Sequence, residues 1–149
     1  MNFRVVIVTN DKSVEQTTLD VIKDADIEVE HILCDTEEKM IKAGKDADVL
    51  LVGTTPNSSK NVMDSLPKLK MIGRSGVGVD SVDLNAATEL GICVTNTPGI
   101  NTTEVADHAM ALLLSITRNI NELTYKTSKG EWTNNRASLN HSKSKMERI

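Results

Sequence analysis

Short β-branched runs alternate with helical patterns along this chain, and this alternation restricts its possible folds more than any other feature. The strands that these runs predict cover residues 3–8, 27–33, 48–52, 69–73 and 92–95. The helices that apolar spacing predicts cover residues 14–24, 36–44, 59–66, 84–90 and 102–121. Strands that alternate with helices form a parallel sheet joined by right-handed crossovers. We therefore expect an α/β fold.

Five strands in this order favour a flavodoxin-like five-stranded parallel sheet with helices on both faces. The strongest helical signal covers residues 102–121, where Val105, Leu112 and Ile116 share one face. The last strand run predicts that Cys93 is a core residue. In open sheets of this kind, binding sites lie at the carboxyl ends of the strands. The loops at those ends are therefore the candidates for function.

The composition excludes several classes of protein. A chain of 149 residues suits one domain, and three aromatic residues are too few for a base-stacking surface that binds single-stranded nucleic acid. The net charge of −4 argues against a general polyanion binder. The chain has no apolar run near the roughly 20 residues of a membrane span and no signal-peptide pattern. Its two cysteines form neither a disulfide framework nor a metal-binding spacing, so we expect a soluble cytoplasmic protein.

The charge changes sign near the end of the chain. Residues 1–125 carry a net charge of −8, whereas residues 126–149 carry +4 and have few apolar side chains. Such a tail buries too little surface to offset the entropy of ordering it. We expect a domain over 1–125 and a poorly ordered hinge or linker over 126–149, and the alternative for the tail is a functional basic arm.

Three loops follow predicted strands and could carry chemistry, at residues 9–13, 53–58 and 73–80. The third reads G-R-S-G-V-G-V-D and is the strongest candidate. Its glycines allow backbone N–H groups to approach an anion, while Arg74 can pair with a carboxylate or phosphate through two N–H groups. A tight turn that needs glycine for its geometry alone explains the same pattern. Both interpretations stay open on the residues.

The glycines of this loop do not form a dinucleotide-binding fingerprint. Gly76 and Gly78 give G-x-G, but the third glycine of the pattern falls on Ser81. The next predicted helix begins only near Leu84, so no helix N-terminus follows the glycines directly. Asp80 and Asp83 lack a third ligand at suitable spacing, so no metal site is expected.

The stretch from Pro67 to Asn119 resembles a known family. It contains G-R-S-G-V-G-V-D, D-L-N-A-A-T, G-I-C-V-T-N-T-P-G and E-V-A-D-H in order. These motifs resemble those of the NAD-dependent D-2-hydroxyacid dehydrogenases, with the phosphoglycerate dehydrogenase-like branch the most similar. The segment Lys129-Gly130-Glu131-Trp132 resembles the family's segment before the interdomain linker.

The resemblance implies an oxidoreductase that oxidises the CH–OH group of a small D-2-hydroxy acid with NAD as the acceptor. It implies that Arg74 and the N–H groups of Ser75, Gly76 and Val77 hold the substrate carboxylate. Val77 and Thr102 would lie near the nicotinamide end of NAD. The full-length form is expected to be a homo-oligomer that binds neither nucleic acid nor membrane.

The resemblance also places much of the machinery outside this chain. The family's nucleotide-binding lobe, a Rossmann domain, would begin just after Ile149 and supplies the catalytic histidine, its glutamate and a substrate-binding arginine. We therefore expect the chain to be truncated before that domain, to supply no catalytic residue and to be inactive alone. Its apolar surface, including part of the helix over 102–121, is then expected to be exposed.

Two further points stay open. The loop over 53–57 carries no arginine, where phosphoglycerate enzymes often have one for the phosphate, and this weakens the phosphoglycerate assignment relative to another small 2-hydroxy or 2-oxo acid. The alternative function is a stand-alone module that binds a small carboxylate or a partner protein without catalysis. Such a module would keep Arg74 and the glycine loop and would need no cofactor.

Overall fold

The computed structural model describes residues 3–9 and 27–131 of the chain. The predicted helix over 14–24 and most of the predicted linker lie outside these residues. The chain divides into two compact units, Met1–Ile100 and Asn101–Ile149.

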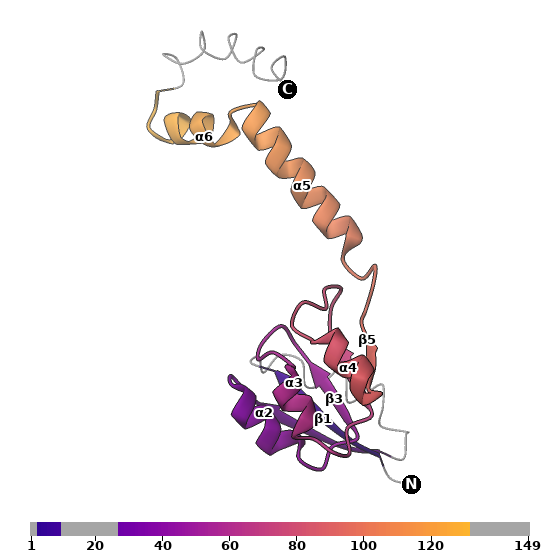
Figure 1. The fold of residues 1–149 in the computed structure, drawn as a ribbon. Coiled ribbons are helices and arrows are strands. Elements are labelled where there is room, and N and C mark those ends of the chain that lie inside the picture. The colour runs from indigo at the N-terminus through magenta and orange to yellow at the C-terminus, as the bar shows by residue number, and fades with distance from the viewer. Residues whose placement is uncertain (1–2, 10–26, 132–149) are drawn as a thin grey trace. The chain divides into compact units, whose positions relative to one another are not determined.

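The first unit is built on one sheet of five parallel strands (Figure 1). The strands are β1 (Phe3–Thr9), β2 (Ile27–Leu33), β3 (Val49–Val52), β4 (Met71–Arg74) and β5 (Cys93–Thr95). Their order across the sheet is β2-β1-β3-β4-β5. This order confirms the flavodoxin-like parallel sheet that the sequence predicts. All strands are parallel, but β2 is added on one side of β1, whereas β3, β4 and β5 are added on its other side. The crevice at such a change in the order of strands favours ligand binding.

Three helices of this unit are described, and each begins at a capping side chain. They are α2 (Glu37–Gly44), α3 (Lys60–Asp64) and α4 (Leu84–Leu90). The side chains of Thr36, Ser59 and Asp83 accept a hydrogen bond from the backbone N–H three residues later, which satisfies an otherwise unpaired donor. Gly91 ends α4 with a left-handed backbone (φ +68°), as the sequence predicts for a helix that stops at glycine.

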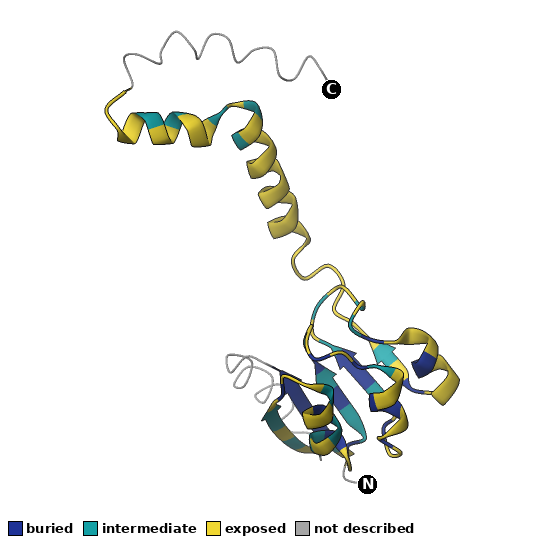
Figure 2. Ribbon diagram, turned by 60° about the vertical axis from the view of Figure 1, so that its left-hand side comes forward, coloured by how far each residue is buried: buried dark blue, intermediate teal, exposed yellow. Residues whose placement is uncertain are grey.

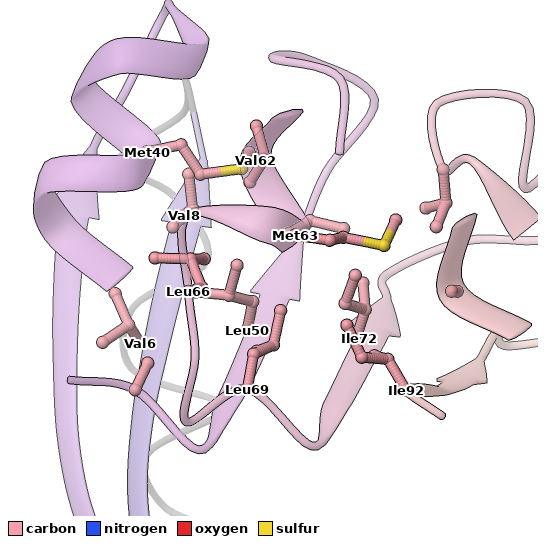
Figure 3. Close-up of a cluster of buried hydrophobic side chains, with 14 of the residues drawn as sticks. Val6, Val8, Met40, Leu50, Val62, Met63, Leu66, Leu69, Ile72 and Ile92 are labelled. Atoms are coloured by element: carbon pink, nitrogen blue, oxygen red, sulfur yellow. The ribbon is translucent and has the colours of Figure 1, made fainter. Parts of the chain in front are cut away.

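The core lies between one face of the sheet and these helices (Figure 3). Alternate strand residues point into it, because successive side chains of a strand face opposite sides. The strand contributions include Val6, Val8, Leu50, Val52 and Ile72. The helices and their flanking turns contribute Met40, Val62, Met63, Leu66 and Ala86 among others. The described helices of this unit thus pack on one face of the sheet, and the predicted helix over 14–24 lies outside the described residues.

On the second face of the sheet, Val5 and Ile7 of β1 are buried, whereas the described residues nearer to the β5 edge are less buried (Figure 2). Leu51 and Met71 are half-buried there, and Cys93 is exposed. The prediction that Cys93 is a core residue is therefore wrong. Its strand is only three residues long and lies at the sheet edge, and Cys93 is in register with Met71 on the face opposite the core.

The described part of the second unit, residues 101–131, forms two helices in place of the single helix predicted over 102–121. They are α5 (Thr102–Thr117) and α6 (Ile120–Ser128). The break occurs at Asn119, whose φ of +53° is left-handed and is tolerated by asparagine better than by most residues. The predicted domain boundary after residue 125 falls inside α6, and the division into a substrate-binding domain and a linker stays a prediction.

Apolar side chains are exposed along α5, as the sequence analysis expects for part of this helix. None of its residues is buried. The large exposed side chains are Val105, Met110, Leu112, Leu113, Leu114 and Ile116. Three consecutive leucine side chains spread over about 200° around the helix axis, so the apolar surface of α5 is not confined to a single stripe. Among the described residues, no helix is both long and apolar enough to cross a membrane.

Acid is expected to weaken the fold through Asp48, which lies just before β3. Lys70 Nζ donates a 2.7 Å hydrogen bond to its carboxylate, and the Arg4 amide donates another at 3.1 Å. These bonds hold the pKa of Asp48 below its ordinary value of 3.8, because both favour the charged form. The native carboxylate therefore takes up a proton less readily than the unfolded chain. The stabilising effect of this carboxylate is complete at pH values above its pKa in the unfolded chain. The effect is lost as the pH falls through the lowered pKa of the folded state.

The melting temperature of the chain should consequently fall as the pH drops below about 4. The fall of the melting temperature with decreasing pH should be less steep in Asp48→Asn. It should also be less steep in Lys70→Met, which removes the hydrogen-bond donor to Asp48. The double variant should be no shallower than Asp48→Asn, because both changes remove one interaction. An acid slope that is the same in wild type and both single variants would contradict this account.

Candidate functional site

The carboxyl ends of β1, β3 and β4 lie side by side, and they bring parts of the three predicted loops to one edge of the sheet. Thr9, at the end of β1, lines a cavity together with Arg74 and Ser75, at the end of β4. Thr54 and Asn57, in the loop after β3, line a second cavity that also includes Arg74. Arg74 is therefore the residue that both cavities share.

The first cavity has a volume of about 230 Å³ and lies on the face of the sheet opposite the core. Ile7, Leu51 and Gly73 form its apolar part. Its polar lining consists of Thr9, Arg74, Ser75, Thr95, Asn96 and Thr97. A Cβ at Gly73 would lie 2.6 Å from Leu51 Cδ2, so a larger residue at this position would force the end of the leucine side chain to shift.

The second cavity is polar and has a volume of about 210 Å³. Its lining is Thr54, Asn57, Arg74, Asp80 and Ser81. Backbone bonds fix its two walls to each other, because the Ser58 amide donates to Ser81 O at 2.7 Å and the Asp83 amide donates to Ser58 O at 3.0 Å. The loop after β3 is thereby held against the loop that follows Gly78.

Arg74 lies folded over its own loop. One terminal nitrogen of its guanidinium donates a 2.7 Å hydrogen bond to Ser75 O. The Nε atom is buried and has no hydrogen-bond partner among the described residues. A guanidinium has five N–H donors in a rigid fork, so most of its hydrogen-bonding capacity is available to an anion. This arrangement is the main reason to regard the loop as an anion site.

Two of the predicted backbone donors already have partners within the protein. The Ser75 amide donates to Val52 O at 3.0 Å, and the Gly76 amide donates to Arg74 O at 3.0 Å. The Ser75 hydroxyl also bonds to Val52 O, at 3.1 Å. The bonds to Val52 hold Ser75 against β3, whereas the Gly76 bond closes a tight turn within the loop itself. A ligand could use either amide only by sharing or replacing these bonds.

The next two amides are available. In the described part of the chain, the amides of Val77 and Gly78 donate no backbone hydrogen bond. Asn96 Nδ2 donates to Val77 O at 2.7 Å, which fixes this peptide from the side of β5. Val77 was predicted as a donor, whereas Gly78 was missed. The sequence pattern G-x-G pointed to the loop but could not tell which of its amides the protein itself uses.

Thr102, the other predicted cofactor residue, is the exposed first residue of α5 in the second unit. A shared contact of Val77 and Thr102 with one cofactor therefore stays a prediction. In the first unit, α4 begins only at Leu84, so the amides of a helix N-terminus do not extend the glycine loop. Among the residues that the structure describes, no three His, Cys, Asp or Glu side chains lie close enough together to hold a metal ion.

Replacing Gly76 by alanine should destabilise the first unit. Its φ of +148° lies where side chains are strained, and a Cβ there would collide with the Arg74 guanidinium. A non-glycine residue held in such a region costs about 1–3 kcal/mol. Gly53→Ala is the matched control, because no atom lies within 4 Å of its Cβ position and its φ is not in this region. Denaturant unfolding should show a loss of stability for Gly76→Ala only, and equal losses for both variants would contradict the described loop.

Comparison with protein families gives one match over nearly the whole chain. The family described as "D-isomer specific 2-hydroxyacid dehydrogenase, catalytic domain" matches residues 5–149. The match includes the sheet apart from Phe3 and Arg4, the lining of both cavities, and the helices α5 and α6.

Individual proteins match over shorter stretches. A D-3-phosphoglycerate dehydrogenase of Methanocaldococcus jannaschii is 44% identical over 101 residues, which are 68% of this chain and 19% of that protein. A glyoxylate reductase of Thermococcus litoralis is 40% identical over 93 residues, which are 62% of this chain and 28% of that protein. The chain thus spans less than a third of the length of either relative.

Solved structures support the same relationship. The crystal structure of an NAD-dependent formate dehydrogenase from Staphylococcus aureus in complex with NAD matches with a TM-score of 0.73 and 27% identity. The match covers 93% of this chain and 45% of that one. Nearly all of this chain therefore corresponds to somewhat less than half of that enzyme.

Proposed function

Because this chain belongs to the D-isomer specific 2-hydroxyacid dehydrogenase family, we propose that it is the substrate-binding part of an NAD-dependent oxidoreductase that interconverts a small D-2-hydroxy acid and its 2-oxo acid. One observation carries this proposal beyond the family relationship. Arg74 lines both cavities at the carboxyl edge of the sheet and keeps a buried Nε without a partner among the described residues.

In this proposal the loop after β4 holds the substrate carboxylate. Arg74 supplies a positive charge and several N–H donors, and the amides of Val77 and Gly78 supply two more donors on the same loop. Hydrogen bonds between charged groups are shorter and stronger than neutral ones, so this combination fixes the position of the acid. Ser75 and Gly76 keep the loop in shape through their bonds to Val52 and Arg74.

A bound cofactor would supply the hydride chemistry, with NAD⁺ as the acceptor for oxidation of the hydroxy acid and NADH as the donor for reduction of the oxo acid. The described residues can contribute little of its site, since the glycine loop is not followed by a helix N-terminus that could hold a pyrophosphate. Val77, whose side chain is 44% exposed, and Thr102 remain our candidates for contact with the nicotinamide end. The role of this chain is thus to bind and orient the acid.

The chain alone should not oxidise NADH in the presence of 2-oxo acids. Hydride transfer needs an acid or base that exchanges a proton with the substrate oxygen. Within the described part of the chain, the residues that line the two cavities include no histidine. The absorbance of NADH should stay constant with glyoxylate or pyruvate, and turnover by the purified chain would overturn this assignment of roles.

Binding of the acid tests the proposal itself. Isothermal titration of the chain with glycolate should give saturable binding, whereas glycolamide, which lacks the charge, should not bind measurably at the same concentrations. Equal binding of the two would contradict a carboxylate site. Binding of glycolate with no measurable response to NADH is equally expected for the alternative, a stand-alone carboxylate-binding module. That alternative would be favoured only if a protein containing this chain and a nucleotide-binding domain also failed to turn over.

We also propose that the protein forms a homo-oligomer and acts in the cytoplasm. The oligomer is supported by the exposed apolar side chains of α5, which would be covered by a partner, as large exposed apolar patches often are. The location is supported by the two cysteines, Cys34 and Cys93, which are both free thiols. Analytical ultracentrifugation should detect a species larger than the 16.3 kDa monomer.

A further inference from the structure

We propose that Asn96 is a positioning residue for the carboxylate site. Its side chain, together with the backbone N–H of Thr97, sets the direction of the two loop amides assigned to the acid, those of Val77 and Gly78. This inference rests on the proposed function, since it concerns how the loop after β4 is prepared for its ligand. Asn96 and Thr97 follow β5 directly and line the first cavity.

Two hydrogen bonds join the segment after β5 to the loop after β4. The Thr97 amide donates to Gly76 O at 3.0 Å. Asn96 Nδ2 donates to Val77 O at 2.7 Å. The two acceptors are carbonyl groups of successive residues. The segment after β5 therefore fixes two successive peptide groups of the loop, one through a backbone bond and one through the Asn96 side chain.

The shape of the peptide group turns these bonds into a direction for each N–H. Both peptides are trans, and the C=O and N–H of a planar trans peptide point to opposite sides. Gly76 O shares its peptide with the Val77 N–H, and Val77 O shares its peptide with the Gly78 N–H. Both carbonyls are bonded to the segment after β5, so both N–H groups point away from it. Successive N–H groups that point to one side of a loop form a concave site for an anion.

The same bonds strengthen the two donors. A hydrogen bond accepted by a carbonyl polarises its peptide group, and the N–H of that peptide becomes a better donor. Asn96 is neutral, so it acts on the Gly78 N–H without offering the acid a competing positive charge. Asn96 is also exposed, so its loss removes nothing from the core. Its contribution should therefore appear in ligand binding and not in the stability of the fold.

The test compares Asn96→Ala with the wild-type chain by amide NMR and by calorimetry with glycolate. Loss of the bond to Val77 O should move the ¹⁵N resonance of Gly78 in the ligand-free chain, because that nitrogen belongs to the same peptide. The affinity for glycolate should fall about 3-fold to 10-fold, as expected for one neutral hydrogen bond. The melting temperature should stay close to that of the wild type. Asn61→Ala, which removes an exposed asparagine of α3, is the control and should change none of these values.

Two further variants separate the donor from the rest of the side chain. Asn96→Gln keeps an amide that can donate and should retain more affinity for glycolate than Asn96→Ala. Asn96→Asp has nearly the same size, but its ionised carboxylate cannot donate to Val77 O and repels an acid. It should therefore bind glycolate no more tightly than Asn96→Ala.

The possible outcomes distinguish this inference from the proposed function. Wild-type affinity for glycolate in Asn96→Ala would overturn the positioning role and leave the carboxylate site intact. A loss of affinity accompanied by a fall in melting temperature and by shifts throughout the ligand-free spectrum would show a structural role only, and would also overturn it. Failure of the wild-type chain to bind glycolate would overturn the proposed function, and this inference with it.

Discussion

Arg74→Ala should weaken the binding of a small 2-hydroxy acid by about 10-fold to 150-fold. This corresponds to a total loss of about 1.5–3 kcal/mol, the range for a hydrogen bond to a charged group. Arg74 is the one cation among the described residues that line the two cavities, so no neighbouring side chain of the lining can replace it. Isothermal titration with glycolate measures the loss directly.

Two companion variants separate charge from geometry. Arg74→Lys keeps the positive charge but lacks the planar fork that pairs with both carboxylate oxygens, so it should recover only part of the affinity. Arg118→Ala removes an arginine from the end of α5 in the second unit and should leave glycolate binding unchanged. If Arg74→Ala bound glycolate as tightly as the wild type, Arg74 would not belong to the site.

Leu50→Ala should lower the free energy of unfolding by about 2–5 kcal/mol, the range for a fully buried leucine. Leu50 lies on β3 and is completely buried between the sheet and the helices. Its truncation leaves a cavity among Val6, Val62 and Leu66, which belong to the same core cluster. A loss of this size is a large part of the 5–15 kcal/mol that stabilises a typical domain.

The neighbouring residue provides a matched control for this core prediction. Leu51 lies on the same strand but faces the other side of the sheet, where it is half-buried and lines the first cavity. Leu51→Ala should therefore cost clearly less than Leu50→Ala, because it removes fewer contacts and leaves no enclosed void. Urea unfolding of both variants measures the difference. Equal losses would mean that the second face is buried as deeply as the first.

The sheet could be predicted because its signals are local. Four of the strands are apolar runs bounded by turn residues, and the strand over 27–33 alternates apolar and polar residues, so each was recognised to within two residues. Two predictions were wrong, those for the burial of Cys93 and for one continuous helix over 102–121, and neither outcome can be read from the local apolar pattern. Cys93 has a strand-like neighbourhood, but its exposure depends on its position on an edge strand, on the face opposite the described helices of the first unit. The break at Asn119 depends on one left-handed residue inside a continuous apolar pattern.

The candidate site was predictable in part for the same reason. The glycines and Arg74 identify the loop after β4 from sequence alone. The pairing of Ser75 with Val52 and the approach of Asn57 to Asp80 arise from separate loops that only the folded sheet brings together. The sequence therefore indicated where an anion could bind but not which amides were available or what lies beside Arg74.

The measurement that tests the carboxylate site most directly is an amide NMR titration of the ¹⁵N-labelled chain with glycolate. Each amide reports its own surroundings, so the spectrum locates the ligand without any substitution. We predict that the largest shifts occur at Arg74, Val77 and Gly78 and follow one saturation curve. Shifts centred elsewhere in the chain, or no saturable shift in the loop after β4, would contradict the account.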